Sequence, residues 1–235
     1  MSGNDGKITK ITCGTTIEKS VPIVFEFHHD WAPLGVEHAV SLFREGFFDG
    51  APFFRVIKGF LVQFGLVYDK DLQKRLGDTS IPDDPQLDPP IPFAPGIISY
   101  AGSGKNSRSS HLFVSYGSAK SLGTMPWETP LGVITSGMET LRSLNGEYGD
   151  TPNQGKIRNQ GRAYINEEFP NMDHMTTCTI DEQEDGIPME ELVAAFSSTG
   201  DKWFFISSAV VGAFICFFVL RKLLKMRGVG ETKKN

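Results

Sequence analysis

The sequence predicts a β-rich domain followed by a C-terminal membrane helix. In residues 21–28 an aliphatic and aromatic face recurs at every second position, which is the period of a β-strand. Residues 53–65 indicate two short apolar strands broken at Lys58-Gly59. Residues 203–220 carry no charge, and an apolar run of this length is typical of a helix that crosses a bilayer.

Length and composition limit the class of protein. A chain of 235 residues suits one β-rich domain of about 150–200 residues with a further segment attached. Its 25 glycines and 14 prolines indicate many turns. The net charge of −5 gives no reason to expect nucleic-acid binding. Cys13, Cys178 and Cys216 form no C-x-x-C pair, which argues against a zinc site, and we expect neither a metal nor a cofactor.

The N-terminal part of the chain predicts two strands and a helix. Residues 1–6 are polar and expected to be disordered, and residues 7–13 form a first strand before the one at 21–28. Ala32-Pro33-Leu34-Gly35 opens a helix of about ten residues, which Gly46 ends. Three neighbouring histidines fit no standard metal-ligand spacing, so we assign structural roles to His28, His29 and His38.

The middle of the chain alternates loops with short elements. Residues 68–95 contain six prolines and six aspartates without the spacing of a calcium-binding loop, which favours a solvated loop. Residues 102–110 are rich in Gly and Ser but lack the pattern of a phosphate-binding loop. The elements expected after them are a strand at 129–134, a helix at 136–144, a polar loop at 146–166 and a last strand at 173–180.

The C-terminal part changes composition twice. Residues 181–201 are acidic, carry no Lys or Arg, and are expected to form a linker. The predicted membrane helix occupies 202–222, with Trp203 as an anchor at the membrane interface. A basic tail at 223–235 completes the chain.

The paired strands at 53–65 carry the polar residues of a candidate site. Burying an arginine costs free energy unless a partner is present. Because side chains alternate along a strand, Arg55 points away from Phe54, and Gln63 points away from Phe64. If the two strands pair, Arg55 and Gln63 lie close together beside Phe60, which places a cation, an amide and an aromatic wall around one shallow site.

The same run resembles the signature of the cyclophilins, the cyclosporin-binding peptidyl-prolyl isomerases. Eight positions match in order and without a gap: Phe54, Arg55, Val56, Ile57, Gly59, Phe60, Gln63 and Gly65. A second similar block comprises Pro95-Gly96-Ile97-Ile98-Ser99-Tyr100-Ala101, Asn106 and His111-Leu112-Phe113-Val114. The resemblance covers residues 7–180 and implies a closed eight-stranded antiparallel barrel capped by two helices.

The resemblance also implies an activity and the residues that perform it. Rotation of a prolyl peptide bond is slow because the nitrogen lone pair is delocalised, and a donor that polarises this nitrogen accelerates it. By resemblance Arg55 is that donor, and Gln63 holds it and contacts a substrate carbonyl. Proline-containing segments of protein clients would bind to a groove formed by Phe60, Leu61, Ala101, Gly102, Ser103, His111, Phe113 and Leu122.

Several positions depart from the family pattern. Gly102 stands where the family usually has Asn, and His111 where it has Gln. Ser121-Leu122-Gly123 replaces the family's W-L-D, and Glu128 takes the position of its His. We therefore expect weak or no cyclosporin binding. The favoured function is an isomerase that assists protein folding at a membrane, and the alternative is a catalytically weak or inactive proline-binding scaffold.

The resemblance also places the cysteines, whereas membrane topology follows from the charges on either side of the uncharged run. The family's first and last strands pair, so Cys13 and Cys178 are expected to be neighbours and to form a disulfide in an oxidising compartment. The acidic linker and basic tail favour a lumenal domain in the endoplasmic reticulum or Golgi, with a targeting segment upstream of this sequence. Because no signal peptide follows Met1, the alternative is a tail-anchored protein with a cytosolic domain.

Overall fold

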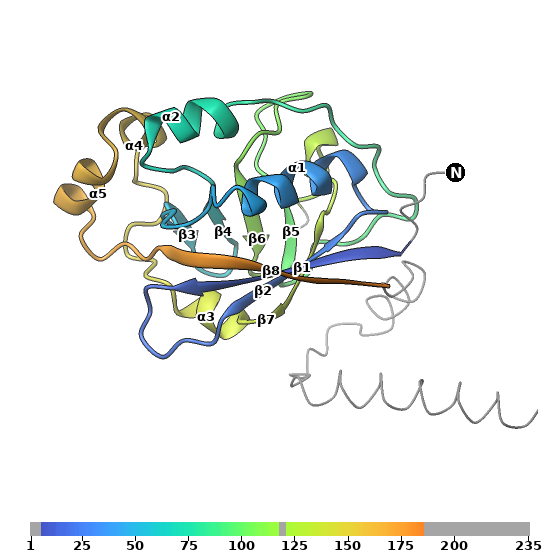
Figure 1. The fold of residues 1–235 in the computed structure, drawn as a ribbon, viewed down its shortest axis with the longest axis horizontal. Coiled ribbons are helices and arrows are strands. Elements are labelled where there is room, and N and C mark those ends of the chain that lie inside the picture. Colours follow the sequence, from blue (N-terminus) through green and yellow to red (C-terminus); the bar gives the residue numbers. More distant parts are fainter. Residues whose placement is uncertain (1–5, 118–120, 186–235) are drawn as a thin grey trace, which may run out of the picture. The chain divides into compact units, whose positions relative to one another are not determined.

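The computed structural model describes residues 6–117 and 121–185, which form one curled sheet with helices around it (Figure 1). The strands are β1 (Lys7–Thr15), β2 (Ile23–His28), β3 (Arg55–Ile57), β4 (Leu61–Phe64), β5 (Ile97–Tyr100), β6 (Leu112–Ser115), β7 (Gly132–Ser136) and β8 (Met175–Asp185). Their order across the sheet is β3-β4-β6-β5-β7-β2-β1-β8, and neighbouring strands are antiparallel. The mainly-β class therefore agrees with the prediction.

The predicted closed barrel is wrong, because this sheet is open. In the part of the chain that the structure describes, β3 and β8 are the two edges and do not pair. The chain just before β3 is linked instead to the start of β8 and the residues before it. The Phe53 N–H donates to the Asp173 carbonyl (3.0 Å), and the Met175 N–H donates to the Ala51 carbonyl (2.9 Å). Pro52 and His174 form an isolated bridge between these two bonds, and β3 itself has only three residues.

Two predicted helices are present on either side of the sheet. α1 (Pro33–Arg44) lies above it in Figure 1 and α3 (Met138–Ser143) lies below it. The proline at the start of α1 suits the first helical turn, where its missing N–H costs nothing. Phe43 from α1 packs on Phe25 from β2 with ring centres 5.5 Å apart, and Phe64 from β4 closes on the same ring at 5.9 Å. This aromatic cluster fixes α1 and β4 to the core.

Two segments predicted as loops contain helices. The loop expected at 68–95 begins with α2 (Lys70–Leu72), which continues into a π-helical turn, Gln73–Gly77. The polar loop expected at 146–166 instead contains α4 (Gln154–Gln160) and α5 (Arg162–Glu168), which flank Gly161. Both helices bury apolar side chains in a second small core, made up of Phe54, Leu66, Ile157, Tyr164, Ile165, Phe169 and Met172. That core holds α4 against the β3–β4 hairpin.

The first and last strands lie side by side, with Cys13 and Cys178 as cross-strand partners. A disulfide joins these two cysteines, whose Cα atoms are 4.2 Å apart. β8 continues to Asp185, past residue 180 where the sequence places the end of the domain. The disulfide thus ties the last strand to the first near the edge of the sheet.

The membrane prediction falls on residues outside this region. Within 6–117 and 121–185 no helix has the length and apolarity needed to cross a bilayer. The predicted membrane helix at 202–222 and the basic tail at 223–235 lie outside the described residues.

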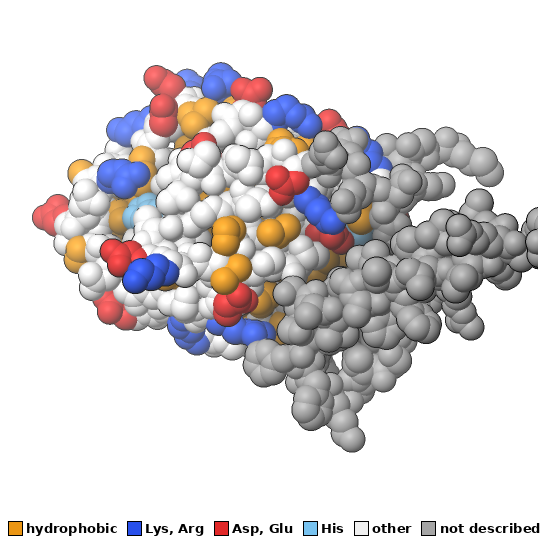
Figure 2. Space-filling model, turned by 60° about the horizontal axis from the view of Figure 1, so that its bottom comes forward, with side chains coloured by type: hydrophobic (Ala, Val, Ile, Leu, Met, Phe, Trp, Pro, Cys, Tyr) orange, Lys and Arg blue, Asp and Glu red, His pale blue; other side chains and the backbone are white. Residues whose placement is uncertain are grey.

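Figure 2 shows one face of the molecule, on which Lys and Arg side chains lie among Asp and Glu, with a few hydrophobic side chains near its middle.

Candidate functional site

The β3–β4 hairpin places Arg55 and Gln63 opposite each other. The two residues are direct cross-strand partners, as strand alternation predicts. Gly59 takes a positive φ of 77° in the connecting turn, a conformation that favours glycine, and the Phe60 N–H donates to the Ile57 carbonyl at 3.0 Å. The guanidinium carbon of Arg55 lies 6.0 Å from the centre of the Phe60 ring. The hairpin alone therefore supplies a cation, an amide and an aromatic wall.

The neighbouring strand β6 completes an apolar pocket beside this pair. Phe113 is the cross-strand partner of Gln63 on the side away from Arg55. Its ring stacks on Phe93 with centres 5.8 Å apart, which fixes its orientation. Leu61 and Leu122 also line the pocket. An apolar wall next to fixed donors suits a proline ring whose peptide bond faces the donors.

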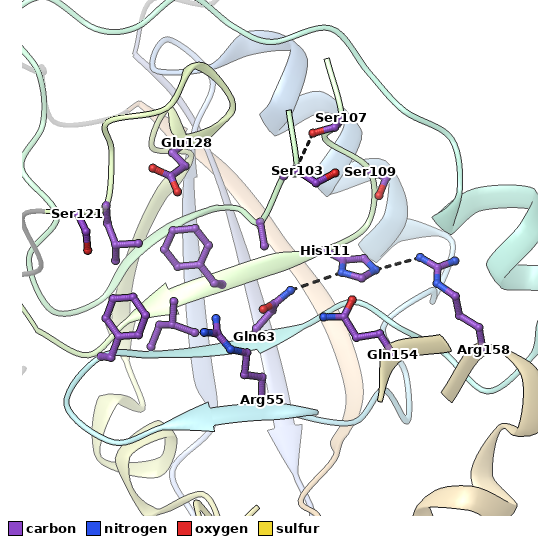
Figure 3. A pocket seen from close by; sticks show the side chains of 16 residues that line it. Arg55, Gln63, Ser103, Ser107, Ser109, His111, Ser121, Glu128, Gln154 and Arg158 are labelled. Carbon is purple, nitrogen blue, oxygen red and sulfur yellow. Dashed lines mark hydrogen bonds between the residues drawn. The ribbon is translucent and has the colours of Figure 1, made fainter. Parts of the chain in front are cut away.

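A single cavity of about 590 Å³ brings the predicted site residues together (Figure 3). Its lining includes every residue that the sequence assigned to catalysis or substrate binding: Arg55, Phe60, Leu61, Gln63, Ala101, Gly102, Ser103, His111, Phe113 and Leu122. Sequence reasoning missed the remaining lining residues as parts of the site, namely Ser107, Ser109, Ser121, Glu128, Gln154 and Arg158. The volume is typical of a site that holds a small ligand or a short peptide segment.

Arg108, a buried residue of the loop at residues 101–110, anchors this loop to the rest of the domain. This side chain is fully buried, and its Nη1 donates to Asp84 Oδ2 at 2.8 Å. The same carboxylate accepts the first backbone N–H groups of α1, from Leu34 (3.0 Å) and Gly35 (2.8 Å). Arg108 also lies over the Tyr100 ring, 5.4 Å from its centre. The ion pair between Arg108 and Asp84 therefore fixes the loop at residues 101–110, called the substrate loop below, to the start of α1.

Trp127 packs against the backbone of Gly102. A Cβ atom at position 102 would lie 2.6 Å from Cδ1 and Cγ of the indole, so no larger residue fits without displacing the ring. The departure from Asn at this position therefore makes room for Trp127. Glu128 lines the cavity, and its Oε2 accepts the Gly123 N–H at 2.9 Å.

The helix α4 contributes the part of the site that the sequence did not predict. Asn153 caps this helix by accepting the Lys156 N–H at 2.9 Å, and the buried Ile157 fixes its rotation. Arg158 Nη2 lies 3.1 Å from His111 Nε2, while Arg158 Nη1 pairs with Asp78. A polar cap followed by one buried apolar residue is a weak helix signal, so the sequence predicts a loop here.

His111 lies between Gln63 and Arg158. Gln63 Nε2 is 3.5 Å from its Nδ1, the outer limit for a hydrogen bond. Burial, as the largest cause, and the nearby Arg158 cation together lower the pKa of His111 to about 4, against a smaller opposing effect of Asp78. The imidazole is therefore neutral at physiological pH and offers one donor and one acceptor.

The described part of the chain contains no group of three His, Cys, Asp or Glu residues placed to hold a metal ion. The three neighbouring histidines have separate partners. His28 bonds to Glu26 (3.1 Å), His29 bonds to Thr9 (2.9 Å), and His38 stacks on Tyr100 with ring centres 6.4 Å apart. The three histidines therefore contact three different residues, in agreement with the structural roles assigned to them.

Comparison with known proteins places this arrangement in a family. The sequence model of the cyclophilin type peptidyl-prolyl cis-trans isomerase/CLD family matches residues 12–167. The chain is 26% identical to peptidyl-prolyl cis-trans isomerase cypE of Dictyostelium discoideum, across 57% of this chain and 83% of that protein. It is 29% identical to a probable peptidyl-prolyl cis-trans isomerase of Brucella abortus, across 60% of this chain and 74% of that protein.

Solved structures share the fold. The crystal structure of a Cryptosporidium parvum cyclophilin type peptidyl-prolyl cis-trans isomerase superposes with a TM-score of 0.54 at 18% identity. The match covers 74% of this chain and 98% of that one. A second crystal structure of the Cryptosporidium protein, in the presence of the dipeptide Ala-Pro, gives the same TM-score at 17% identity.

Proposed function

The chain belongs to the cyclophilin-type peptidyl-prolyl cis-trans isomerases, and we propose that it isomerises X-Pro bonds of protein segments bound between Arg55 and Phe113. The observation that carries this proposal is the cross-strand pairing of Arg55 with Gln63 beside an apolar pocket. The Ala-Pro dipeptide present with the Cryptosporidium relative supports a proline-containing substrate.

The chemistry needs no cofactor and no covalent intermediate. The barrier to rotation is about 18–20 kcal/mol because the prolyl nitrogen shares its lone pair with the carbonyl. A guanidinium that donates toward this nitrogen withdraws the lone pair from resonance, and it suits the task because it stays charged and holds its donors rigidly. Arg55 thus stabilises the twisted state more than either planar state.

The groove supplies the second half of the mechanism. Phe60, Leu61, Phe113 and Leu122 hold the proline ring still, so that the residue before it rotates around the bond. Gln63 and the backbone of residues 101–103 offer polar groups that position the flanking peptide. Binding energy on both sides of the bond is then used to favour the twisted geometry.

The test is a kinetic comparison of two arginine variants in the full-length chain. Arg55→Ala should lower kcat/KM on an X-Pro peptide roughly a hundredfold, because it removes the charged donor from the transition state. Arg75→Ala is the matched control, since Arg75 is exposed and does not line the cavity, and its rate should equal that of the wild type. Equal rates for Arg55→Ala and the wild type would rule out the catalytic assignment.

A second candidate function is a binding module with weak catalysis. The observation in its favour is Glu128, which lines the cavity where the family has His and brings a negative charge to the groove. In that case the wild type would bind a proline peptide but would not accelerate its isomerisation. Measuring binding and kcat/KM on the same peptide separates the two functions.

We further propose that the chain acts on folding clients at a membrane. The support comes from the uncharged run at 203–220, between an acidic segment and a basic tail. The favoured topology places the isomerase domain in the lumen of the endoplasmic reticulum or Golgi. Protease added to sealed microsomes should leave the domain intact, whereas digestion would indicate a tail-anchored protein with a cytosolic domain.

A further inference from the structure

Four polar side chains lie in a row from the proline pocket to α4: Arg55, Gln63, His111 and Arg158 (Figure 3). Both ring nitrogens of His111 face a neighbour in this row, with Gln63 Nε2 at 3.5 Å from Nδ1 and Arg158 Nη2 at 3.1 Å from Nε2. A neutral imidazole carries one proton, so its two nitrogens cannot both accept. One of the two neighbours must therefore present an acceptor.

Arg158 decides which neighbour that is. A guanidinium can donate hydrogen bonds but cannot accept them. Since Arg158 faces Nε2, that nitrogen must be the acceptor, and the single ring proton must sit on Nδ1. Arg158 is held in this position by Asp78, which pairs with its Nη1 and also accepts from Gln73 Nε2 at 2.9 Å.

The Nδ1 proton in turn sets the orientation of Gln63. The donor on Nδ1 needs an acceptor, and the Gln63 amide has one, its carbonyl oxygen. A half-turn of that amide exchanges its two ends and brings Oε1 to His111. The Gln63 N–H groups then point to the other side, where Arg55 lies (Figure 3). The Gln63 N–H groups would then face a substrate carbonyl in the groove, beside the Arg55 guanidinium that faces the prolyl nitrogen.

We propose that Arg158 is a positioning residue that acts through His111 and makes Gln63 present its N–H groups to the substrate carbonyl. The inference rests on the proposed function, because the carbonyl belongs to the bound X-Pro segment. It assigns a role to α4, a helix that contacts the groove only at this end, through Gln154 and Arg158. In this relay, Arg158 donates to His111 Nε2, the His111 proton is thereby placed on Nδ1, and this proton fixes the orientation of the Gln63 amide.

The first test reads the histidine tautomer directly. Long-range ¹H–¹⁵N spectra of the full-length chain, labelled at histidine, distinguish Nδ1–H from Nε2–H, and His111→Gln identifies the His111 signals by their loss. The wild type should show Nδ1–H. Arg158→Ala should shift His111 toward Nε2–H, and Arg158→Lys, which keeps a donor, should retain Nδ1–H. Lys156→Ala, two positions away on α4 and paired with Glu168, is the matched control and should leave the tautomer unchanged.

The second test is kinetic. Arg158→Ala should lower kcat/KM roughly three- to tenfold, mainly through a higher KM, because one oriented hydrogen bond to the substrate is lost. Lys156→Ala should not change it. Nε2–H in the wild type, or an unchanged tautomer in Arg158→Ala, would overturn the relay. A changed tautomer with unchanged kcat/KM would overturn the positioning role.

These outcomes are separate from a failure of the proposed function. If the wild type and Arg55→Ala show equal rates, the catalytic role of Arg55 is excluded, and the spectra still report whether Arg158 sets the tautomer. If Arg158→Ala does not fold, the wild-type spectrum and Arg158→Lys alone decide the tautomer.

Discussion

Trp127 packs so closely on Gly102 that a Cβ atom on residue 102 would lie only 2.6 Å from Cδ1 and Cγ of the indole. The ring therefore fills the space that a side chain at position 102 would need. Real Cβ atoms do not make contacts this short. The pair therefore has to change together. This relationship explains why the substrate loop carries glycine at a position that lines the groove.

The first prediction follows from this contact. Gly102→Ala should displace the indole and move the 101–103 backbone, which raises KM for a proline peptide and costs roughly 1–3 kcal/mol of stability as overpacking. Trp127 fluorescence and thermal unfolding measure the two effects. The double variant Gly102→Ala/Trp127→Ala removes the clash with the indole, leaving Ser107 Oγ at 2.9 Å from the new Cβ, and should recover most of the binding lost by the single variant. If Gly102→Ala behaves as the wild type, the contact is not restrictive.

The second prediction concerns the disulfide between Cys13 and Cys178. Its sulfurs close a loop with a sequence separation of 165 residues. In the chain-entropy model, cross-links that close loops of this size stabilise by roughly 4–5 kcal/mol, because they restrict the unfolded chain. Changing both cysteines to alanine should therefore lower Tm by many degrees. Wild type treated with reductant should fall to the same Tm, and an untreated wild type that is no more stable than the double variant would contradict the assignment.

The third prediction concerns pH. His111 has an ordinary unfolded pKa of 6.5, and burial lowers its pKa to about 4 in the folded chain. Between these values the unfolded chain binds more protons, so the stabilisation is complete above about pH 6.5 and is lost as the pH falls toward 4. The full loss from this residue is at most about 3 kcal/mol. Burial also lowers the pKa of His29, His38 and His174, which act in the same direction.

Chemical denaturation at a series of pH values measures this dependence. The free energy of unfolding of His111→Gln should fall less steeply between pH 6.5 and 4 than that of the wild type. Isomerase activity should show no inflection near pH 6.5, because His111 stays neutral there. Identical slopes for wild type and His111→Gln would show that this histidine is not buried in its neutral form.

The catalytic half of the site could be predicted from sequence because its geometry is local. Arg55 and Gln63 are eight positions apart, and strand alternation together with the Lys58-Gly59 turn fixes both faces. Arg158 could not be predicted in the same way. Its approach to His111 depends on the packing of α4 against the hairpin, and the two short helices around Gly161 leave almost no periodic signal.

The open sheet was also beyond local reasoning. Most of the strands follow from alternation and turns, and the first and last strands pair as the family resemblance implies. Closure depends on whether the two edge strands reach each other. β3 has only three residues, and an isolated bridge between Pro52 and His174 stands in place of a ladder, which becomes visible only when the whole sheet is assembled.

The fourth prediction is that cyclosporin binds weakly. In the family an indole donates a hydrogen bond to this ligand, and Ser121 takes that position in the cavity. Trp127 does not replace it, because its ring packs against Gly102 and is not part of the cavity lining. A ligand carbonyl left without its donor costs about 1–3 kcal/mol, or roughly ten- to a hundredfold in affinity.

Calorimetry on the full-length chain can separate the hydrogen bond from apolar contact. Ser121→Trp restores both the ring and its N–H, and should tighten cyclosporin binding by roughly the same ten- to a hundredfold. Ser121→Phe restores the apolar area alone and should recover only part of this gain, because the carbonyl stays unpaired. A nanomolar constant for the wild type would contradict the prediction and would mean that Trp127 leaves Gly102 to donate to the ligand.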